Sequence, residues 1–447
     1  MLLTLTNRLK LTNNESDVLR AACRLSKNLF NVGLYTVRQY FFQERKYLRY
    51  EGSYHLCKTN ENYQLLATDI GQQTLKIVDR ALNGFFKLLE LKNSGQYNAK
   101  VRLPGYLPKD GFFPLIIPIR ARDWVKLSDK EWMYSVPMAR AFKRHFGVVS
   151  FQIPERIRDK QVKEIRILPK YGARFFDVAY VYEQENEVQN VGSEYIGIDF
   201  GVGNLATCVT TTGKAFIVDG KPLKARNQWY NKRNALLQSI KDIQGFEKLT
   251  LQQASLLNKR SQQIKAKPAA FRLLCDSSRC RRDYLNKAVR RIVDFCLNEG
   301  IGKVVVGYNP GIKQDANMGT RNNQNFVQIP YHTLRFKLQR LCERVGIEYT
   351  EQEESYTSKA SALDGDEIPS YNADNPQTYT FSGKRIKRGL YRTKTGRLIN
   401  SDANGALNIL RKHLNLSKAD DYLLIGRCSG CVAQPSRLDL EKPCLYP

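Results

Sequence analysis

The chain has 447 residues, 42% of them hydrophobic, which leaves room for two to four domains with cores of their own. Its 71 Lys and Arg against 43 Asp and Glu give a net charge of +28, which favours a polyanionic partner, with nucleic acid as the default and a membrane surface as the competitor. No apolar run reaches the ~18 residues that cross a bilayer. The start MLLTLTNRLKL is too short and too soon interrupted for a secretory signal. The ten cysteines are scattered, which suits a reducing cytoplasm better than a disulfide scaffold.

The first hundred residues combine one strand with two long helices. Residues 1–11 are predicted to be a strand, and apolar residues at helical spacing predict helices over about Ser16–Phe42 and Asp69–Leu91. Polar and basic side chains interleave with aromatic ones on both helices, which suits a nucleic-acid groove, although a bundle helix produces the same pattern. The residues expected to contact nucleic acid here and just beyond are Arg38, Gln72, Lys76, Lys100 and Arg102.

Residues 100 to about 191 contain short β patterns broken by Pro and Gly, which are typical of a small barrel or sandwich. We expect the N-terminal strand to join this sheet, so that the helical pair is an insertion within it. Basic loops such as Arg120–Arg122 are expected on its surface, where an ordinary solvated charge run is the alternative.

The stretch YIGIDFG, Tyr195–Gly201, is predicted to be a short buried strand that carries Asp199 at its C-terminal end. The glycines beside the acid would let another backbone, a metal or a phosphate come close. Two further strand patterns follow, LATCVTTTG and KAFIVDG. Many such strings are only strand ends, so this motif alone does not establish a catalytic site.

A second acidic motif, INSDANGALNILRKHL, lies near the C-terminus. Ser401 and Asp402 are suitable N-cap residues, and Asp402 is expected in the first turn of an amphipathic helix. The apolar residues at helical spacing are Ala403, Leu407, Leu410 and Leu414. A capping acid on a surface helix is the alternative, but it does not explain why two acidic motifs frame the C-terminal half of the chain.

The elements predicted between the two acidic motifs follow one another in an order that is typical of a known fold. Residues 222–299 are predicted to form long basic helices, KVVVGYNPG a strand, YHTLRFKLQRLCERVG a helix, and IEYTEQEESYTSK a strand with its exit loop. Three strands, helices, a strand, a helix, a strand and an acid-bearing helix form the order of an RNase H-like fold. The predicted fold class is therefore α/β plus β, with a mixed sheet and helices in the C-terminal half.

Long ordered motifs run through most of the chain, among them GIDFGVGNLAT, DGKPLKARNQWYNK, GYNPGIKQ, EESYTSKAS and NSDANGALNIL. Together they resemble the TnpB family, the RNA-guided endonucleases of bacterial and archaeal insertion sequences that are similar to the ancestors of type V CRISPR effectors. The resemblance implies a wedge β-barrel, an inserted helical recognition domain, a RuvC nuclease domain and a C-terminal tail. The corresponding residues are 1–12 and 100–191, 13–99, 192–413, and 414–447.

The resemblance also implies a metal-dependent RuvC site in which Asp199, Glu354 and Asp402 are the catalytic acids and metal ligands. Carboxylates are hard oxygen ligands that suit Mg²⁺ or Mn²⁺, and two such ions are expected. Three carboxylates repel one another without cations, so the metal-free site is expected to be loosely ordered.

The second acid departs from the usual family pattern. It usually follows the fourth strand, where this chain reads GYN, with Tyr308 and no carboxylate. A known arrangement in relatives places the Glu further on, and EESYTSK supplies Glu354. Glu351 and Glu353 are close enough in sequence to compete for the role.

The zinc ribbon of many family members is also missing. Residues 364–402 contain no Cys or His, so zinc is not expected, and residues 360–400 are interpreted as a basic, cysteine-free insert in the ribbon's place. The remaining close cysteine pairs are interpreted as structural or incidental: Cys428 with Cys431, and Cys275 with Cys280.

The insert combines basic side chains with the aromatic residues Phe381 and Tyr391, which predicts phosphate contacts and stacking near the active site. A solvated loop is the alternative. The residues chosen as nucleic-acid ligands in this segment are Lys384, Arg385, Lys387, Arg388 and Arg392.

The implied function is RNA-guided cleavage of double-stranded DNA at sites that match the guide and adjoin a short flanking motif, in association with insertion-sequence transposition and maintenance. The implied partners are a guide RNA from the transposon end and double-stranded DNA, with one protein per guide RNA, no membrane, and a nucleoid-associated place in a bacterial or archaeal cytoplasm. Two alternatives are a nuclease-dead RNA-guided repressor, against which the intact Asp199 and Asp402 argue, and a DNA transposase. The transposase would need a nicking Tyr or a His-rich motif, whereas the chain has four unpaired histidines.

Overall fold

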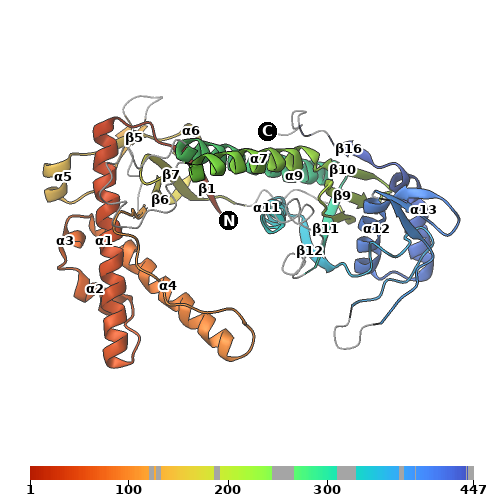
Figure 1. Ribbon diagram of the computed structural model, residues 1–447, viewed down its shortest axis with the longest axis horizontal. Helices are drawn as coiled ribbons and strands as arrows, with labels where there is room; N and C mark the ends of the chain where they lie inside the picture. Colours follow the sequence, from red (N-terminus) through yellow and green to blue (C-terminus); the bar gives the residue numbers. More distant parts are fainter. Residues whose placement is uncertain are drawn as a thin grey trace. The chain divides into compact units, whose positions relative to one another are not determined.

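The structure is a computed structural model (Figure 1). The chain folds into two compact units, Met1–Glu185 and Asn186–Pro447. Each unit is described by itself. The residues described are 1–119, 125–126, 132–185, 192–243, 266–309, 329–371, 377–387, 389–438 and 440. The basic loop Arg120–Arg122 lies outside them.

Two long helices dominate the first unit, α1 (Asn13–Glu44) and α4 (Thr68–Asn93). A capping box fixes the start of α1, because the Thr12 hydroxyl accepts from the Glu15 amide at 3.3 Å while the Glu15 carboxylate accepts from the Thr12 amide at 2.8 Å. Both predicted helices are confirmed, each a few residues longer than expected. The shorter helices are α2 (Tyr50–Cys57), α3 (Glu61–Gln64), α5 (Arg140–Phe146) and α6 (Glu155–Arg158).

The strands of this unit form two antiparallel sheets. The first has the order β1-β7-β6-β2 and the second the order β3-β4-β5. The N-terminal strand β1 pairs with β7 along its whole length, as we expected, so the helices are inserted between strands of one sheet. Among the described strands no pairing closes either sheet, so the wedge barrel remains a prediction. The strands are β1 (Leu2–Arg8), β2 (Leu115–Pro118), β3 (Val125–Lys126), β4 (Trp132–Ser135), β5 (Ser150–Gln152), β6 (Gln161–Lys170) and β7 (Phe175–Glu183).

A six-stranded mixed sheet forms the centre of the second unit, in the order β12-β11-β8-β9-β10-β16. The pair β8–β9 and the pair β9–β10 are antiparallel, whereas β11 is parallel to both β8 and β12. The mixed sheet predicted for this half is therefore present. The strands are β8 (Glu194–Asp199), β9 (Asn204–Thr210), β10 (Ala215–Asp219), β11 (Ile301–Tyr308), β12 (Glu348–Glu353) and β16 (Ser436–Leu438).

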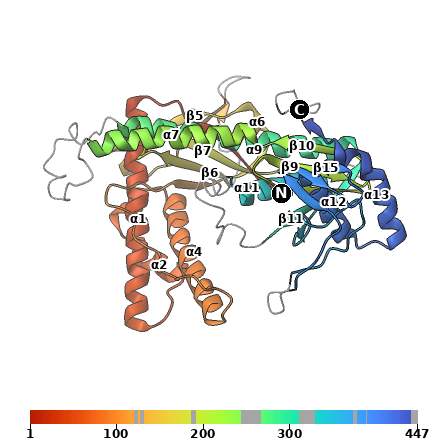
Figure 2. The same ribbon diagram turned by 45° about the vertical axis from the view of Figure 1, so that its right-hand side comes forward.

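Helices cover both faces of this sheet. On one face α9 and α11 supply Ile292 and Leu334 to a core that also contains Ile196 and Ile198 of β8. On the other face α12 packs through Leu410 against Val305 of β11. The helices are α7 (Lys221–Ile243), α9 (Ala266–Asn298), α11 (Tyr331–Val345), α12 (Ser401–Leu414) and α13 (Lys418–Ala433), and α7 runs beside α9 (Figures 1 and 2). The order of elements predicted between the two acidic motifs is confirmed.

The segment predicted as a C-terminal tail is instead part of this unit, so the boundary at residue 414 was wrong. Helix α13 buries Leu424, Cys428 and Val432, which are spaced by four residues, in a core shared with Val209 of β9. Strand β16 then pairs in parallel with β10 and becomes the edge of the sheet. The partner of this short strand lies more than 200 residues earlier in the chain, which is why local patterns did not reveal it.

A small antiparallel sheet leads into α12. It consists of β13 (Lys384–Lys387), β14 (Leu390–Arg392) and β15 (Leu398–Asn400). Tyr391 anchors it, because its ring is buried and its hydroxyl donates to the Lys359 carbonyl at 2.7 Å. We call residues 384–392 the basic hairpin. In the part of the chain that the structure describes, no helix has an apolar stretch long enough to cross a membrane.

Candidate active site

Asp199 is the last residue of the central strand β8, where its carboxylate meets α12. Glycine makes this contact possible, because a Cβ at Gly405 would lie 2.9 Å from Asp199 Oδ2. Beside it, a Cβ on Gly197 of β8 would lie only 2.5 Å from the Ala406 carbonyl. The helix therefore approaches β8 at backbone distance directly beside the acid.

Asp402 lies in the first turn of α12, as predicted, but neither it nor Ser401 is the N-cap. Asn400 caps the helix, and its side-chain oxygen accepts from the amides of Asp402 and Ala403 at 3.0 Å each. The carboxylate of Asp402 is thereby left available. Its Oδ2 accepts a hydrogen bond from Asn204 Nδ2 of β9 at 2.8 Å.

Glu354 follows directly after β12 and is half-buried, with Oε2 beside Gly307 of the neighbouring strand. The two competing acids have other partners. Glu353 forms an ion pair with Lys412 at 2.6 Å, and Glu351 lies 3.7 Å from the Arg335 guanidinium. Of the three glutamates, Glu354 is the one whose charge acts on Asp199.

The charges of these acids are coupled. Burial raises the pKa of Asp199 well above its usual range, and the nearby carboxylates of Glu354 and Asp402 raise it further. Burial also raises the pKa of Glu354, with a further contribution from Glu353. For Glu353 itself burial acts upward, but hydrogen bonds from Lys412 and Ser355 outweigh it and lower the pKa. Asp199 and Glu354 therefore share a site that disfavours negative charge unless a cation is present.

Arg385 of the basic hairpin supplies one positive charge to the site. Its guanidinium lies 3.6 Å from Asp402 Oδ1 and opposes the rise in the pKa of Asp199. The Arg385 side chain is about half exposed, at 48%, so solvent screens this attraction and the side chain remains accessible. The hairpin predicted to lie near the catalytic centre therefore contacts one of the predicted acids.

Two buried asparagines of α12 hold the loop that follows Glu354. Asn404 accepts from the Ala362 amide at 2.9 Å and donates to the Ala360 carbonyl at 2.8 Å. Asn408 donates to the carbonyls of Thr357 and Ala360, both at 2.8 Å. Sequence reasoning missed these residues, although two asparagines one turn apart on the buried side of a helix are a signal that could have revealed them.

The donor chemistry of the three acids fits Mg²⁺ or Mn²⁺, because all of their ligand atoms are carboxylate oxygens. The raised pKa of Asp199 is a second indication, since a bound cation would relieve the repulsion that causes part of it. Among the described residues, no three acidic, His or Cys side chains already lie close enough together to hold a metal ion. The assignment of metal ligands therefore remains a prediction.

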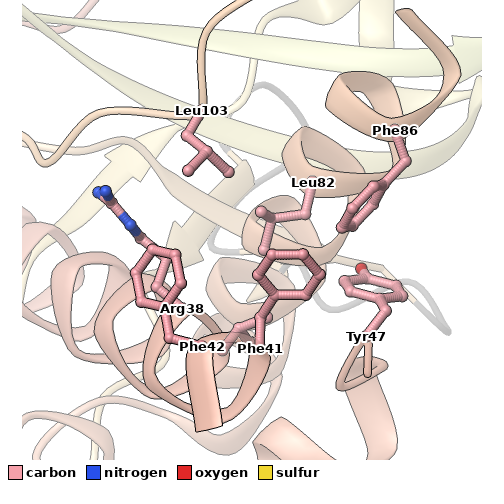
Figure 3. Close-up of a pocket in the computed structure, with 8 residues that line it drawn as sticks. Arg38, Phe41, Phe42, Tyr47, Leu82, Phe86 and Leu103 are labelled. Carbon is pink, nitrogen blue, oxygen red and sulfur yellow. The ribbon is translucent and has the colours of Figure 1, made fainter. Parts of the chain in front are cut away.

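The predicted nucleic-acid residues of the first unit differ in exposure. The Arg38 guanidinium lies 5.0 Å from the Tyr106 ring centroid, at one side of a pocket that Phe41, Phe86 and other apolar residues of α1 and α4 line (Figure 3). Lys76 lies 5.1 Å from the Tyr50 ring centroid. Of the remaining three, Lys100 and Arg102 are exposed and Gln72 is half-buried. Their binding role remains a prediction.

The other predicted ligands of nucleic acid belong to the basic hairpin. Lys384, Arg385 and Lys387 of β13 are exposed, as is Arg392 of β14. Arg388 lies outside the described residues. The strand geometry sends alternate basic side chains to opposite faces, so β13 can present charge on both sides.

The cysteines of the CxxC segment are engaged in packing. Cys428 is fully buried in the α13 core, and its thiol donates to the Thr210 carbonyl at 3.4 Å. Cys431 is half-buried and its thiol donates to the Cys428 carbonyl at 3.2 Å. Cys280 is half-buried, and the side chain of Cys275 lies outside the described part.

Comparison with known proteins agrees with this arrangement. The family model described as "Probable transposase" matches residues 179–266. The TnpB-like protein ORF457 of Acidianus two-tailed virus is 24% identical over 432 residues, which cover 91% of this chain and 86% of the viral protein. A solved structure of a Cas12f1–sgRNA–target DNA complex contains a protein chain with 16% identity and a TM-score of 0.60, covering 90% of this chain and 83% of that one.

The likeness to the Cas12f1 chain is one of fold, since the sequence identity is low. The fold and site define an RNase H-like α/β unit with acids at the end of its central strand and at the start of the helix beside it. The chain is also similar to a TnpB-like protein along most of its length, which agrees with the resemblance of its motifs.

The raised pKa of Asp199 predicts how the metal-free protein responds to pH. Below the unfolded-state pKa both states are protonated. Stability falls as pH rises from the unfolded-state pKa to the folded-state pKa, because the unfolded chain releases its proton in this range while the folded site retains it. Asp199→Asn should therefore raise the midpoint of thermal unfolding in EDTA, and this gain should grow as pH rises from about 4. Glu367→Gln, on an exposed side chain, is the matched control. A gain that is constant with pH would contradict the burial of this acid.

Elemental analysis tests the absence of a zinc ribbon. We expect less than stoichiometric zinc in the purified protein, because the segment before Asp402 has no thiol or imidazole and Cys428 packs in a core. Cys428→Ser should lower thermal stability without changing the zinc content. One zinc per chain that is lost when Cys428 and Cys431 are both replaced would show that α13 holds a metal.

Proposed function

We propose that the chain is an RNA-guided endonuclease that cleaves double-stranded DNA with a metal-dependent RuvC-type site. The observation that carries this proposal is the placement of three acids: Asp199 ends β8, Asp402 lies in the first turn of the helix packed on β8, and Glu354 Oε2 lies beside Gly307 of the adjacent strand β11. The similarity to a TnpB-like protein along most of the chain and the fold shared with a chain solved in complex with sgRNA and target DNA support it. Neither a lone strand-end acid nor a capping acid would account for all three residues.

In this proposal Asp199, Glu354 and Asp402 would hold Mg²⁺ or Mn²⁺. Such ions, when bound, would supply the chemistry that activates a water and stabilises the leaving 3′ oxygen of the phosphodiester. The remaining work is done by the protein itself. Asn204 orients the Asp402 carboxylate, and the α12 asparagines hold the loop that follows Glu354.

The proposed recognition of nucleic acid uses the large positive charge. The guide RNA reads sequence by base pairing, while the protein contacts the heteroduplex backbone and a short flanking DNA motif. The net charge of +28 provides a salt-dependent attraction for both nucleic acids. The basic hairpin adds exposed cations beside Asp402, where Arg385 can contact a phosphate close to the bond that is cut.

A nuclease-dead repressor is the alternative with the same partners, and loss of an acid separates the two. Asp199→Ala and Asp402→Ala should each lower the rate of guided DNA cleavage on the order of 10³-fold or more, while guide and target affinities stay close to those of the wild type. Cleavage and binding are measured on the same protein–RNA complexes. Cleavage at the normal rate by either variant would exclude the proposed site.

The identity of the third acid is tested by three matched substitutions. Glu354→Gln should abolish Mg²⁺-dependent cleavage, because Glu354 is the glutamate coupled to Asp199. Glu351→Gln and Glu353→Gln should retain cleavage, because their carboxylates already pair with Arg335 and Lys412. Full activity in Glu354→Gln, or its loss only in one of the other two, would assign the ligand differently.

The basic hairpin is tested through the salt dependence of cleavage. Replacing Lys384, Arg385, Lys387 and Arg388 by Gln should impair target cleavage at physiological salt and allow partial recovery at low salt, with the salt slope of binding reduced by about one for each lost phosphate contact. The control exchanges each Lys for Arg and each Arg for Lys, which keeps the charge. If the neutral variant matches the wild type at every salt concentration, the hairpin is a solvated loop.

A further inference from the structure

The strand order separates the third acid, Glu354, from Asp199. Glu354 follows β12 and Asp199 ends β8, but β11 lies between these strands. The strand registers show which residue of β11 lies between the two acids. Val306 of β11 pairs with Ile198, the neighbour of Asp199, and Gly307 pairs with Gln352, two residues before Glu354. Gly307 therefore lies between the two acids in the sheet.

The space above Gly307 is occupied by the acid itself. A Cβ at this position would lie 2.6 Å from Glu354 Oε2 and 2.6 Å from the Cδ1 atom of Ile409 on α12. Both distances are shorter than real Cβ contacts. Gly307 is not among the glycines with positive φ, so its backbone conformation is open to any residue. A larger residue would therefore fit here only if the end of the Glu354 or Ile409 side chain moved, so glycine serves space here and not conformation.

We infer that Gly307 is a positioning residue that lets the Glu354 carboxylate extend over β11 toward Asp199. The inference rests on the proposed metal site, because it concerns how one of its ligands is placed. Residue 308 next to it is a tyrosine, so β11 provides no acid of its own at this point, and the missing side chain at 307 makes room for the acid from β12. A methyl group at 307 would displace the carboxylate and weaken the site.

The second contact, with Ile409, offers a competing explanation. In that explanation Gly307→Ala disturbs the packing of α12 and has no effect on the position of Glu354. Two further substitutions separate these effects. Ile409→Val deletes the Cδ1 atom that the new methyl group would meet and relieves the packing contact alone. Glu354→Gln removes the charged ligand, so that nothing remains for the added methyl group to displace from the metal.

The test measures Mn²⁺ binding to the full chain without RNA by electron paramagnetic resonance, and thermal unfolding in EDTA. Gly307→Ala should weaken Mn²⁺ affinity about tenfold or more, as expected for residues that orient a metal ligand. Adding Ile409→Val should restore thermal stability but not Mn²⁺ affinity. In the Glu354→Gln background Gly307→Ala should cause no further loss of affinity. Gly426→Ala, at a glycine with no atom within 4 Å of the added Cβ, is the control and should bind like the wild type.

The outcomes separate the inference from the function it rests on. Mn²⁺ affinity unchanged by Gly307→Ala, or fully restored by Ile409→Val, would show that Gly307 serves packing only and would overturn the inference while leaving the metal site intact. An equal loss in the Glu354→Gln background would also overturn it. If Asp199→Asn bound Mn²⁺ as the wild type does, the proposed site itself would be wrong, and the inference with it.

Discussion

The packing of α12 against β8 is the contact on which the acidic site depends. Gly197 and Gly405 permit it, because a Cβ at either position would collide with the Ala406 carbonyl or the Asp199 carboxylate. This close approach brings Asp402, in the first turn of the helix, to the end of the strand that carries Asp199. Further along the same helix, two buried asparagines fix the loop after β12. One helix thus organises residues that are about 50 to 200 positions apart in the sequence.

The acidic site lowers the stability of the folded chain through its buried charges, and the packing of the rest of the fold does not require these charges. Burial and neighbouring carboxylates raise the pKa of Asp199, and an uncompensated buried charge is destabilising. Asn204 and Arg385 compensate only Asp402 directly, through one hydrogen bond and one partly exposed ion pair. Such local conflict is expected where acidic side chains gather to bind a cation, because the charges that repel one another without the ion would attract it.

Much of this arrangement could be predicted because it depends on local sequence patterns. Helical spacing located α1 and α4, alternation and glycine punctuation located β8 to β10, and Asp199 and Asp402 stood out as acids at element ends. The features that were missed depend on distant contacts. The Asn400 cap was overlooked because Asn400, Ser401 and Asp402 are all good capping residues, and only the helix geometry chooses among them.

The same reason explains the other omissions. Strand β16 is three residues long and acquires its role from β10, and the spacing of apolar residues in α13 gave no sign of which surface it covers. In the sequence, Gly307 only precedes Tyr308, the position that lacks the usual acid, whereas in three dimensions the Glu354 carboxylate lies beside it. Residues whose function is to leave space carry no local signature, so they emerge only when their neighbours are known.

The central claim, that Asp199, Glu354 and Asp402 together bind the catalytic metal, is tested most directly by anomalous diffraction from crystals of the full chain soaked in Mn²⁺. We predict anomalous peaks within bonding distance of all three carboxylates, with Glu351 and Glu353 still paired to Arg335 and Lys412. Manganese bound elsewhere, or bound by Asp199 and Asp402 with Glu354 turned away, would contradict the account.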